Sequence, residues 1–490
     1  MRRRLPAGER RGRGPAPRAA PQARAAGRGR RRARPPETLR HTSAGARSPA
    51  TRGRTDEGSD GPSRKAEPAG SARVIVAAAV STHPVPLRRN RDFVLLQTGQ
   101  ALSSIGSESA TVAYTLLVRS LTHSPAKAGL TGFARLVPWV LFALPAGVAA
   151  DRWNRKWLMI VADVVRAVAL GALGISVATG HVSFAQVPLV AFVEGTAYVV
   201  FNIAEIGAMR SVVPSAQLQR AFATEQARLS AVYLAGPPVG GFLFGISRSL
   251  PFLADAISYA FSTVTLLAMR TPFQEAREDE EPVPILVQIR EGLTWLWKHT
   301  FLRTCALLFA GTNFAFGALE LTLIVVGRRQ GLSGAAIGGL LAIVGAMALA
   351  GSLAAPRLMR TFSMRTVIIG NMWLAVPVAA FLFHATALVL VASTAPLFFF
   401  NPTLNAMIIG YRVAIVPDRL QGRVNSVARS LALLALPLGP VVAGVLLGAF
   451  SARATVGCLA AFLVALAIAA TASRSIRGAP TFEEAVAAVS

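Results

Sequence analysis

The sequence predicts an all-α membrane protein whose twelve transmembrane helices form two pseudo-symmetric six-helix bundles. Three observations predict this fold class. Hydrophobic residues make up 53% of the 490 residues and charged residues only 15%, a balance that a soluble domain of this size does not normally show. Beyond residue 88 the chain is a succession of apolar runs long enough to cross a bilayer. The two halves of that region also share short motifs at a nearly constant spacing.

Residues 1–88 form a basic tail that is rich in Arg, Pro, Gly and Ala. The first 70 residues hold 19 Lys and Arg against 6 Asp and Glu, so about half of the net charge of +27 lies here. Such a segment lacks the apolar residues that fill a core, so we expect it to be disordered. Two interpretations stay open: an extension without function, or a segment that contacts anionic lipid or RNA. No nucleic-acid partner is expected for the protein.

The thickness of the bilayer sets the length of each predicted span. Only helices and closed barrels satisfy every backbone polar group in the apolar core, and a helix needs about 20 residues to cross it. Runs of this length lie at 93–118, 128–150, 157–179, 184–208, 224–246, 250–270, 304–327, 332–354, 365–384, 387–410, 424–449 and 453–472.

The distribution of Lys and Arg between alternate connections predicts the orientation. The connections that follow even-numbered spans, together with the C-terminal segment, hold 18 Lys and Arg, whereas the opposite set holds 6. Basic residues of short connections remain on the cytoplasmic side. We therefore expect a multi-pass protein of the inner (plasma) membrane with both termini in the cytoplasm.

Residues 271–303 divide the spans six and six. They separate an N-terminal bundle, 89–270, from a C-terminal bundle, 304–475, and residues 476–490 form a C-terminal tail. The linker begins with the acidic run TPFQEAREDEEPVP and continues with ILVQIREGLTWLWKHT. The second part predicts an amphipathic helix on the cytoplasmic surface. Its apolar face consists of Ile285, Ile289, Leu293, Leu296 and Trp297.

An internal repeat connects the two bundles. GPPVGGFLFG at 236–245 matches GPVVAGVLLG at 439–448, and AADR at 149–152 resembles AAPR at 354–357. Both pairs fall in nearly one register, which chance does not readily produce. Two homologous six-helix bundles are an arrangement of transporters rather than of channels or enzymes.

The segment PAGVAADRWNRK at 145–156 resembles the loop signature of the major facilitator superfamily, which lies between helices 2 and 3. Asn154 stands where the signature usually has Gly. In that family the acid meets the N-terminus of helix 11 when the transporter faces outward, so the resemblance implies a charge lock at Asp151. The second-half copy has Pro356 instead of the acid, so the lock is expected on one side only. The residues that match the signature are Gly147, Asp151, Arg152, Arg155 and Lys156.

The run GPPVGG resembles the end of the helix 5 signature of antiporters, and plain helix packing is the alternative interpretation of Gly and Pro there. The residues concerned are Gly236, Pro237, Gly240 and Gly241, with Gly439, Pro440 and Gly444 in the second copy. Over about residues 88–475 the chain resembles the exporter branch with enterobactin-exporter-like and macrolide-efflux-like proteins. This implies alternating-access export of a small amphipathic organic molecule, of drug or siderophore class, by proton antiport. The helix 4 Arg of many proton-coupled members is replaced by Ala191.

Three carboxyl groups within the spans have no basic neighbour at helical spacing: Glu108, Glu194 and Glu320. An ionisable residue at a helix centre costs about 2.5–3.5 kcal/mol to insert, so each calls for an explanation. A carboxyl group away from water can load and release a proton near neutral pH, which coupling requires. Alternatively, Arg135 neutralises one of the three across the bundle.

Other ionisable residues favour structural interpretations. Asp163 and Arg166 are three residues apart and therefore share a helix face, so we expect an ion pair; they are the next candidates for coupling. Glu225 and Arg228 have the same spacing and the same expectation. Asp255 lies near the outer end of its span, where interfacial water is expected to solvate it.

Enzyme classes have little support in the sequence. It shows no phosphate loop, metal-ligand cluster or nucleophile motif, and its two cysteines lie far apart, so we expect neither catalysis nor a cofactor nor a metal. The expected partners are a small-molecule substrate, protons and the lipid bilayer, and the protein is expected to be a monomer. A nutrient symporter and a non-transporting sensor on a transporter scaffold remain the alternatives.

Overall fold

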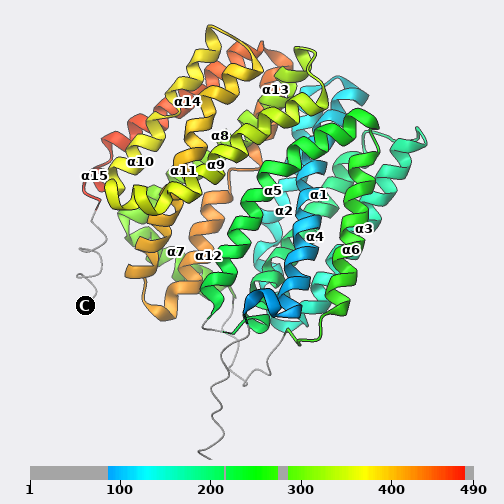
Figure 1. Cartoon of the computed structure of the whole chain (residues 1–490). Coiled ribbons are helices and arrows are strands. Elements are labelled where there is room, and N and C mark those ends of the chain that lie inside the picture. Colours follow the sequence, from blue (N-terminus) through cyan, green and yellow to red (C-terminus); the bar gives the residue numbers. More distant parts are fainter. Residues whose placement is uncertain (1–85, 215–216, 274–284, 480–490) are drawn as a thin grey trace, which may run out of the picture. The chain divides into compact units, whose positions relative to one another are not determined.

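The computed structural model describes residues 86–214, 217–273 and 285–479, and in these residues every regular element is a helix (Figure 1). Most of the predicted N-terminal tail, the acidic start of the linker and most of the C-terminal tail lie outside the described residues. Eleven helices in the described part are long and apolar enough to cross a membrane. A twelfth, α1, completes the set of spans that the sequence predicts.

The first six spans are single helices with clear polar caps at several starts. Asn90, Ser124 and Asn154 each accept a hydrogen bond from a backbone N–H in the first turn of the helix that follows. The helices are α1 (Arg91–Thr122), α2 (Pro125–Arg152), α3 (Arg155–Ala178), α4 (Gln186–Val212), α5 (Leu218–Ile246) and α6 (Leu250–Ala268).

Helix α1 is less apolar than the other spans, because it carries polar residues whose partners lie inside the protein. It packs along α5 and α6. Gln100 Nε2 donates to Ser262 Oγ at 3.0 Å, and the hydroxyls of Ser107 and Tyr259 are 2.7 Å apart. Satisfied pairs of this kind allow polar side chains in a span.

The second half contains the surface helix α7 and six further spans, two of which are broken. The ninth span, predicted as one helix over 365–384, stops at Trp373 and continues as a 3-10 helix that contains Pro377. The eleventh, predicted as one helix over 424–449, is interrupted just before Leu438, where Pro437 lacks the N–H that a continuous helix needs. The elements are α7 (Ile285–Lys298), α8 (Thr300–Arg329), α9 (Gly334–Thr361), α10 (Met364–Trp373), η3 (Val376–Leu382), α11 (Ala387–Ile415), α12 (Gln421–Leu433), α13 (Leu438–Ala449), α14 (Ala452–Ala472) and the short α15 (Arg474–Arg477).

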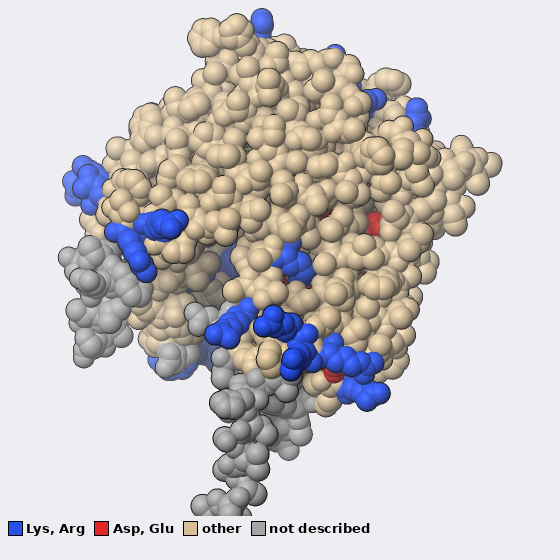
Figure 2. Space-filling view, in the orientation of Figure 1, with Lys and Arg blue, Asp and Glu red and all other residues tan. Residues whose placement is uncertain are grey.

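Positive charge distinguishes the two ends of the helix bundle. We call the end at which α2 passes into α3 the basic end, and the end at which α1 passes into α2 the far end. Figure 2 shows Lys and Arg gathered over the lower part of the molecule, where α2, α4 and α6 end, while the broad middle is almost uncharged. Such an uncharged belt is what contact with lipid requires.

The GPPVGG motif of α5 joins the first half to the second near the far end. Gly240 lies against the backbone of Ser109 in α1, within its own half. Gly241 lies so close to the Gly334 carbonyl of α9, in the other half, that a Cβ atom there would overlap it. Pro237, one turn earlier, has its carbonyl against Gly338 of α9. The absence of side chains therefore permits the closest approach between the halves.

The second copy of the motif repeats this arrangement on α13. Gly439 lies against the Phe314 carbonyl of α8, in its own half, and Gly444 against Pro125 of α2, in the other half. The Pro440 carbonyl lies against Gly129 of α2. Both motifs thus close the far end at equivalent places.

The basic end, in contrast, is hollowed on its surface (Figure 2). The basic-end parts of α5, α11 and α12 expose polar side chains, among them Thr224, Gln226, Asn405 and Ser426. Figure 2 shows a recess at this end with basic side chains around it. The structure is therefore closed at the far end and accessible from the basic end.

Candidate transport site

An ion pair between α2 and α4 lies at the centre of the candidate site. Arg135 Nε donates to Glu194 Oε2 at 2.8 Å, with side-chain exposures of 17% and 1%. Gly195 allows this close approach, since a Cβ atom there would overlap the Arg135 carbonyl. Arg135 therefore neutralises Glu194 across the bundle, as one of the two interpretations of the three carboxylates expected.

The other two predicted carboxylates lie near the same arginine. Glu108 of α1 is within electrostatic reach of Arg135, Glu194 and Glu320 of α8. In the described part of the chain, neither Glu108 nor Glu320 forms a hydrogen bond or an ion pair. Glu108 is half-buried and Glu320 is exposed, although each lies more than two turns from either end of its helix. Side chains exposed at this depth face either the space between the halves or the lipid, and a charged group favours the space between the halves.

The antiporter-like motif contacts this site directly. A Cβ atom at Gly236 of α5 would overlap the side chain of Glu108, and Ser109 Oγ donates to the Gly236 carbonyl at 2.9 Å. The motif therefore serves two purposes in the structure: its first glycine makes room for Glu108, and its later glycines close the far end.

The site contains more negative than positive charge. Arg135 lies near three carboxylates, and Glu194 alone is paired with it. The next cation, Arg166, is already paired with Asp163. Two carboxyl groups, one from each half, remain available to bind a cation or a proton. These two carboxyl groups can therefore exchange a bound cation for protons.

The predicted pair Asp163–Arg166 is present on α3, and Tyr259, whose hydroxyl donates to Glu194 Oε1 at 3.5 Å, connects it to the site. The two side chains form a buried ion pair on α3. The Arg166 guanidinium lies 4.1 Å from the ring centre of Tyr259 and 4.7 Å from that of Phe201. Aromatic faces stabilise a buried cation of this kind. The enclosure of the pair favours a structural role over coupling.

Two expectations about ionisable residues are wrong. Arg228 forms its ion pair with Glu205 of α4, at 3.1 Å, rather than with Glu225. Asp255 is 0% exposed instead of solvated, and its Oδ1 accepts a hydrogen bond from Ser258. Local spacing cannot find a partner 23 residues away on another helix, and nearness to a helix end does not show whether a neighbouring helix covers the residue.

The gating loop is described in part. Gly147 and Asp151 lie in the last two turns of α2, but the side chain of Asp151 lies outside the described part of the structure. Arg152 is exposed. Arg155 Nε donates to the Ala150 carbonyl at 3.1 Å, and Lys156 Nζ to the Met269 carbonyl, just beyond α6, at 2.7 Å. These two bonds lie within the first half, and the charge lock to helix 11 stays a prediction.

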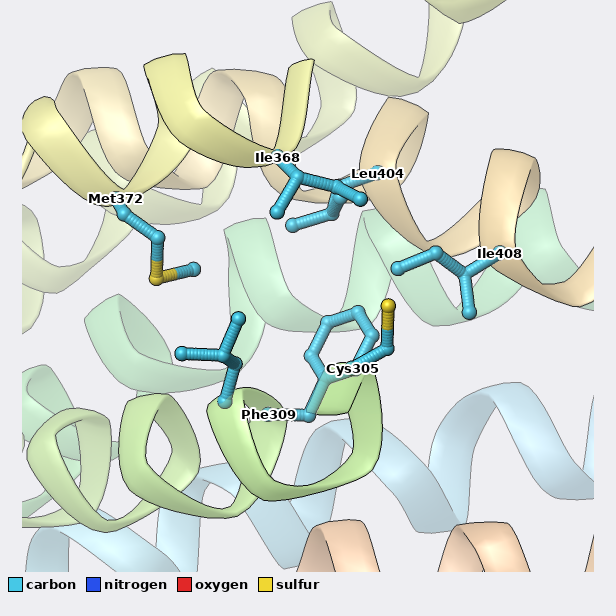
Figure 3. A pocket seen from close by; sticks show the side chains of 7 residues that line it. Cys305, Phe309, Ile368, Met372, Leu404 and Ile408 are labelled. Atoms are coloured by element: carbon cyan, nitrogen blue, oxygen red, sulfur yellow. The ribbon is translucent and has the colours of Figure 1, made fainter. Parts of the chain in front are cut away.

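A separate small cavity lies inside the second half (Figure 3). Its lining is apolar and comes from α8, α10 and α11. The residues are Cys305, Leu308, Phe309, Ile368, Met372, Leu404 and Ile408. Since the lining offers no charged group, this cavity is not a place for proton exchange. Among the described residues no three His, Cys, Asp or Glu side chains gather as metal ligands do.

Comparisons with known proteins place this architecture among transporters. The family model described as Major Facilitator Superfamily matches residues 97–411. The multidrug efflux pump Tap of Mycobacterium tuberculosis is 25% identical over 390 residues, which cover 77% of this chain and 92% of Tap. Macrolide efflux protein A of Streptococcus pyogenes is 26% identical over 228 residues, 46% of this chain and 55% of that protein. A bacterial homologue of the human lysosomal transporter Spinster, solved inward-facing and unoccupied, has a TM-score of 0.65 at 16% identity and covers 81% of this chain and 98% of its own.

Proposed function

The chain belongs to the major facilitator superfamily of transporters, and on this premise we propose that it exports a small amphipathic organic cation by proton antiport with alternating access. Export is supported by the names of the two similar proteins, a multidrug efflux pump and a macrolide efflux protein. Proton coupling is supported by the carboxyl groups beside Arg135.

The proposed orientation places the basic end in the cytoplasm, as the excess of Lys and Arg there favours. With this orientation the described conformation is inward-facing, since the glycine contacts close the far end. Substrate enters from the cytoplasm or the inner leaflet through the space between the halves.

One observation carries the proposal: Glu108 and Glu320, from opposite halves, are within electrostatic reach of each other and lack an ion-pair partner in the described residues. In the inward-facing state both release protons to the cytoplasm and bind the cation between them. After the switch, protons from outside neutralise both groups and the cation leaves. The neutral site then returns inward, because two unpaired carboxylates in the closed core are costly.

The charge of the site also selects between the predicted substrate classes. Three carboxylates around Arg135 repel an anion and attract an amine, because Arg166 nearby is already balanced by Asp163. Drug-like cations therefore fit better than anionic siderophores. Glu194 is paired with the Arg135 guanidinium, so Arg135 is not free to bind an anionic substrate.

The experiment is transport into everted membrane vesicles with a panel of size-matched cationic, neutral and anionic compounds, with and without a pH gradient. We expect cations to accumulate only when the vesicle interior is acidic, and each uptake event to release protons from the lumen. Preference for anions contradicts the substrate class. Accumulation that follows a sodium gradient instead contradicts proton antiport.

A further inference from the structure

Helix α7 has one face packed on the protein and one face that is largely exposed. On the packed face Leu296 is fully buried, and Gly292 lies against the Arg423 backbone of α12. The side chains of Glu291 and Arg423 form an ion pair that holds the same two helices together. On the other face, Leu293 is 38% exposed and Trp297 is 48% exposed.

The short connection between α7 and α8 determines how deep this exposed face lies in the membrane. Only His299 separates the end of α7 from Thr300, the first residue of the α8 span. Arg303 in the first turn of α8 donates to the Trp297 carbonyl at 3.1 Å, and its guanidinium lies 5.5 Å from the centre of the Trp297 ring. Trp297 therefore lies where α8 enters the apolar core, which is the level at which membrane proteins place tryptophan.

The exposed apolar residues border a shallow hollow with a positive rim. Leu293, Thr294, Trp297 and Lys298 line the hollow. Arg303 lies beside it, against the Trp297 ring. Glu291 is the acidic residue of α7, and Arg423 already pairs with it. The surface therefore offers apolar contact, a hydroxyl group and uncompensated positive charge at one depth.

We propose that this hollow is a binding site for an anionic phospholipid of the cytoplasmic leaflet. The headgroup phosphate lies near Lys298 and Arg303, and the upper part of the acyl chains covers Leu293 and Trp297. Each basic residue near such a surface contributes about 1 kcal/mol to lipid attraction. A zwitterionic lipid provides the same apolar contact without the net charge, so the site distinguishes lipids by headgroup.

A competing occupant is the acidic segment of this chain just before α7. It contains Glu275, Glu278, Asp279, Glu280 and Glu281, and its charge also complements the rim. The membrane fits better because the acidic segment offers few apolar groups for Leu293 and Trp297. The experiment must therefore separate these two occupants.

The test uses the full chain in nanodiscs of phosphatidylcholine that contain either brominated phosphatidylglycerol or the same amount of brominated phosphatidylcholine. Bromine quenches a nearby tryptophan, and Trp297→Phe identifies the part of the signal that comes from Trp297. Trp157→Phe, at another exposed tryptophan, is the matched control. We expect brominated phosphatidylglycerol to quench the Trp297 signal more strongly than brominated phosphatidylcholine.

Charge reversal then shows whether the basic rim causes this excess. Lys298→Glu is expected to abolish the excess, whereas Arg365→Glu, at an exposed position of the same end, retains it. Equal quenching by both lipids, or an excess that survives Lys298→Glu, overturns the proposal. An excess that appears only after the five acids are changed to Gln assigns the hollow to the acidic segment and overturns it as well. Because the readout is lipid contact, failure of the transport proposal does not affect it.

Discussion

The two halves share one architecture but differ in where they carry charge. In the described part of the first half, three ion pairs lie within the spans, and they are Arg135–Glu194, Asp163–Arg166 and Glu205–Arg228. In the described part of the second half, Glu320 is the one carboxylate within a span. That half is mostly apolar, with aromatic contacts such as Phe316 and Phe398, whose ring centres are 4.6 Å apart. The two halves can therefore share a backbone arrangement without sharing the positions of their ionisable residues.

Under the proposed function, this difference gives the two halves different roles in transport. The first half holds the charges that respond to protons, and the second half contributes one acid and an apolar surface for the body of the substrate. The variants below test where this comparison holds, beginning with the largest expected effect.

Arg166→Met should cause the largest loss of stability. It leaves the buried Asp163 without its partner, which costs about 3–5 kcal/mol. The free energy of unfolding, measured by titration of mixed micelles with a denaturing detergent, should fall by this amount. The double variant Asp163→Asn, Arg166→Met should recover most of the loss. If the double variant is no more stable than the single one, the pair does not account for the stability of this region.

Gly334→Ala and Gly444→Ala test whether the two halves close the far end equally. Each new Cβ atom would crowd a backbone carbonyl of the opposite half, so each should destabilise the closed far end by about 1–3 kcal/mol. Cysteines placed at the far end should label faster in both variants. Gly339→Ala and Gly448→Ala, where a Cβ atom meets nothing within 4 Å, are the controls. An effect in one half alone would show that the repeat is functionally asymmetric here as well.

Asp151→Asn tests the predicted lock at the basic end, which only the first half carries. Loss of an acid near a helix N-terminus should weaken the outward-facing state by about 0.5–2 kcal/mol. Cysteines on the basic end should label faster, and transport should fall more than expression. Unchanged labelling together with unchanged transport would mean that Asp151 is an ordinary solvated acid.

Deletion of residues 1–80 should have the smallest effect. The deleted segment contains no predicted span, and the connections between the spans repeat the topology signal. Insertion, measured by protease protection, and transport should both remain at the wild-type level. Loss of either would assign the tail a role that its composition does not indicate.

The fold followed from the sequence because membrane insertion depends on local quantities. Span length and hydropathy depend on residues that are close in the chain, so eleven spans are visible as apolar runs. The breaks before η3 and at Pro437 were not predicted, because other prolines, such as Pro138 and Pro237, remain inside continuous helices. Whether a proline interrupts a helix depends on its neighbours in space.

The sequence predicted only part of the site, because the ion-pair partner of an acidic residue can lie far away in the chain. The acids Glu108, Glu194 and Glu320 were identified by the lack of a local base, and the structure brings all three near Arg135. Glu205 was missed because its partner Arg228 lies on another helix. Burial of Asp255 was missed because close packing of α1 at Gly106 covers it. No spacing rule within one helix contains this information.

The most direct test of the account compares uphill transport with exchange in purified, reconstituted protein that carries Glu108→Gln, Glu320→Gln or both. An amide keeps the shape of the acid but cannot release a proton. We predict that the double variant loses pH-driven accumulation of the cation, while it retains some downhill exchange that proves it is folded. Each single variant should transport with fewer protons released per cation. Full pH-driven accumulation in the double variant would contradict the claim that these two carboxyl groups, one from each half, couple protons to export.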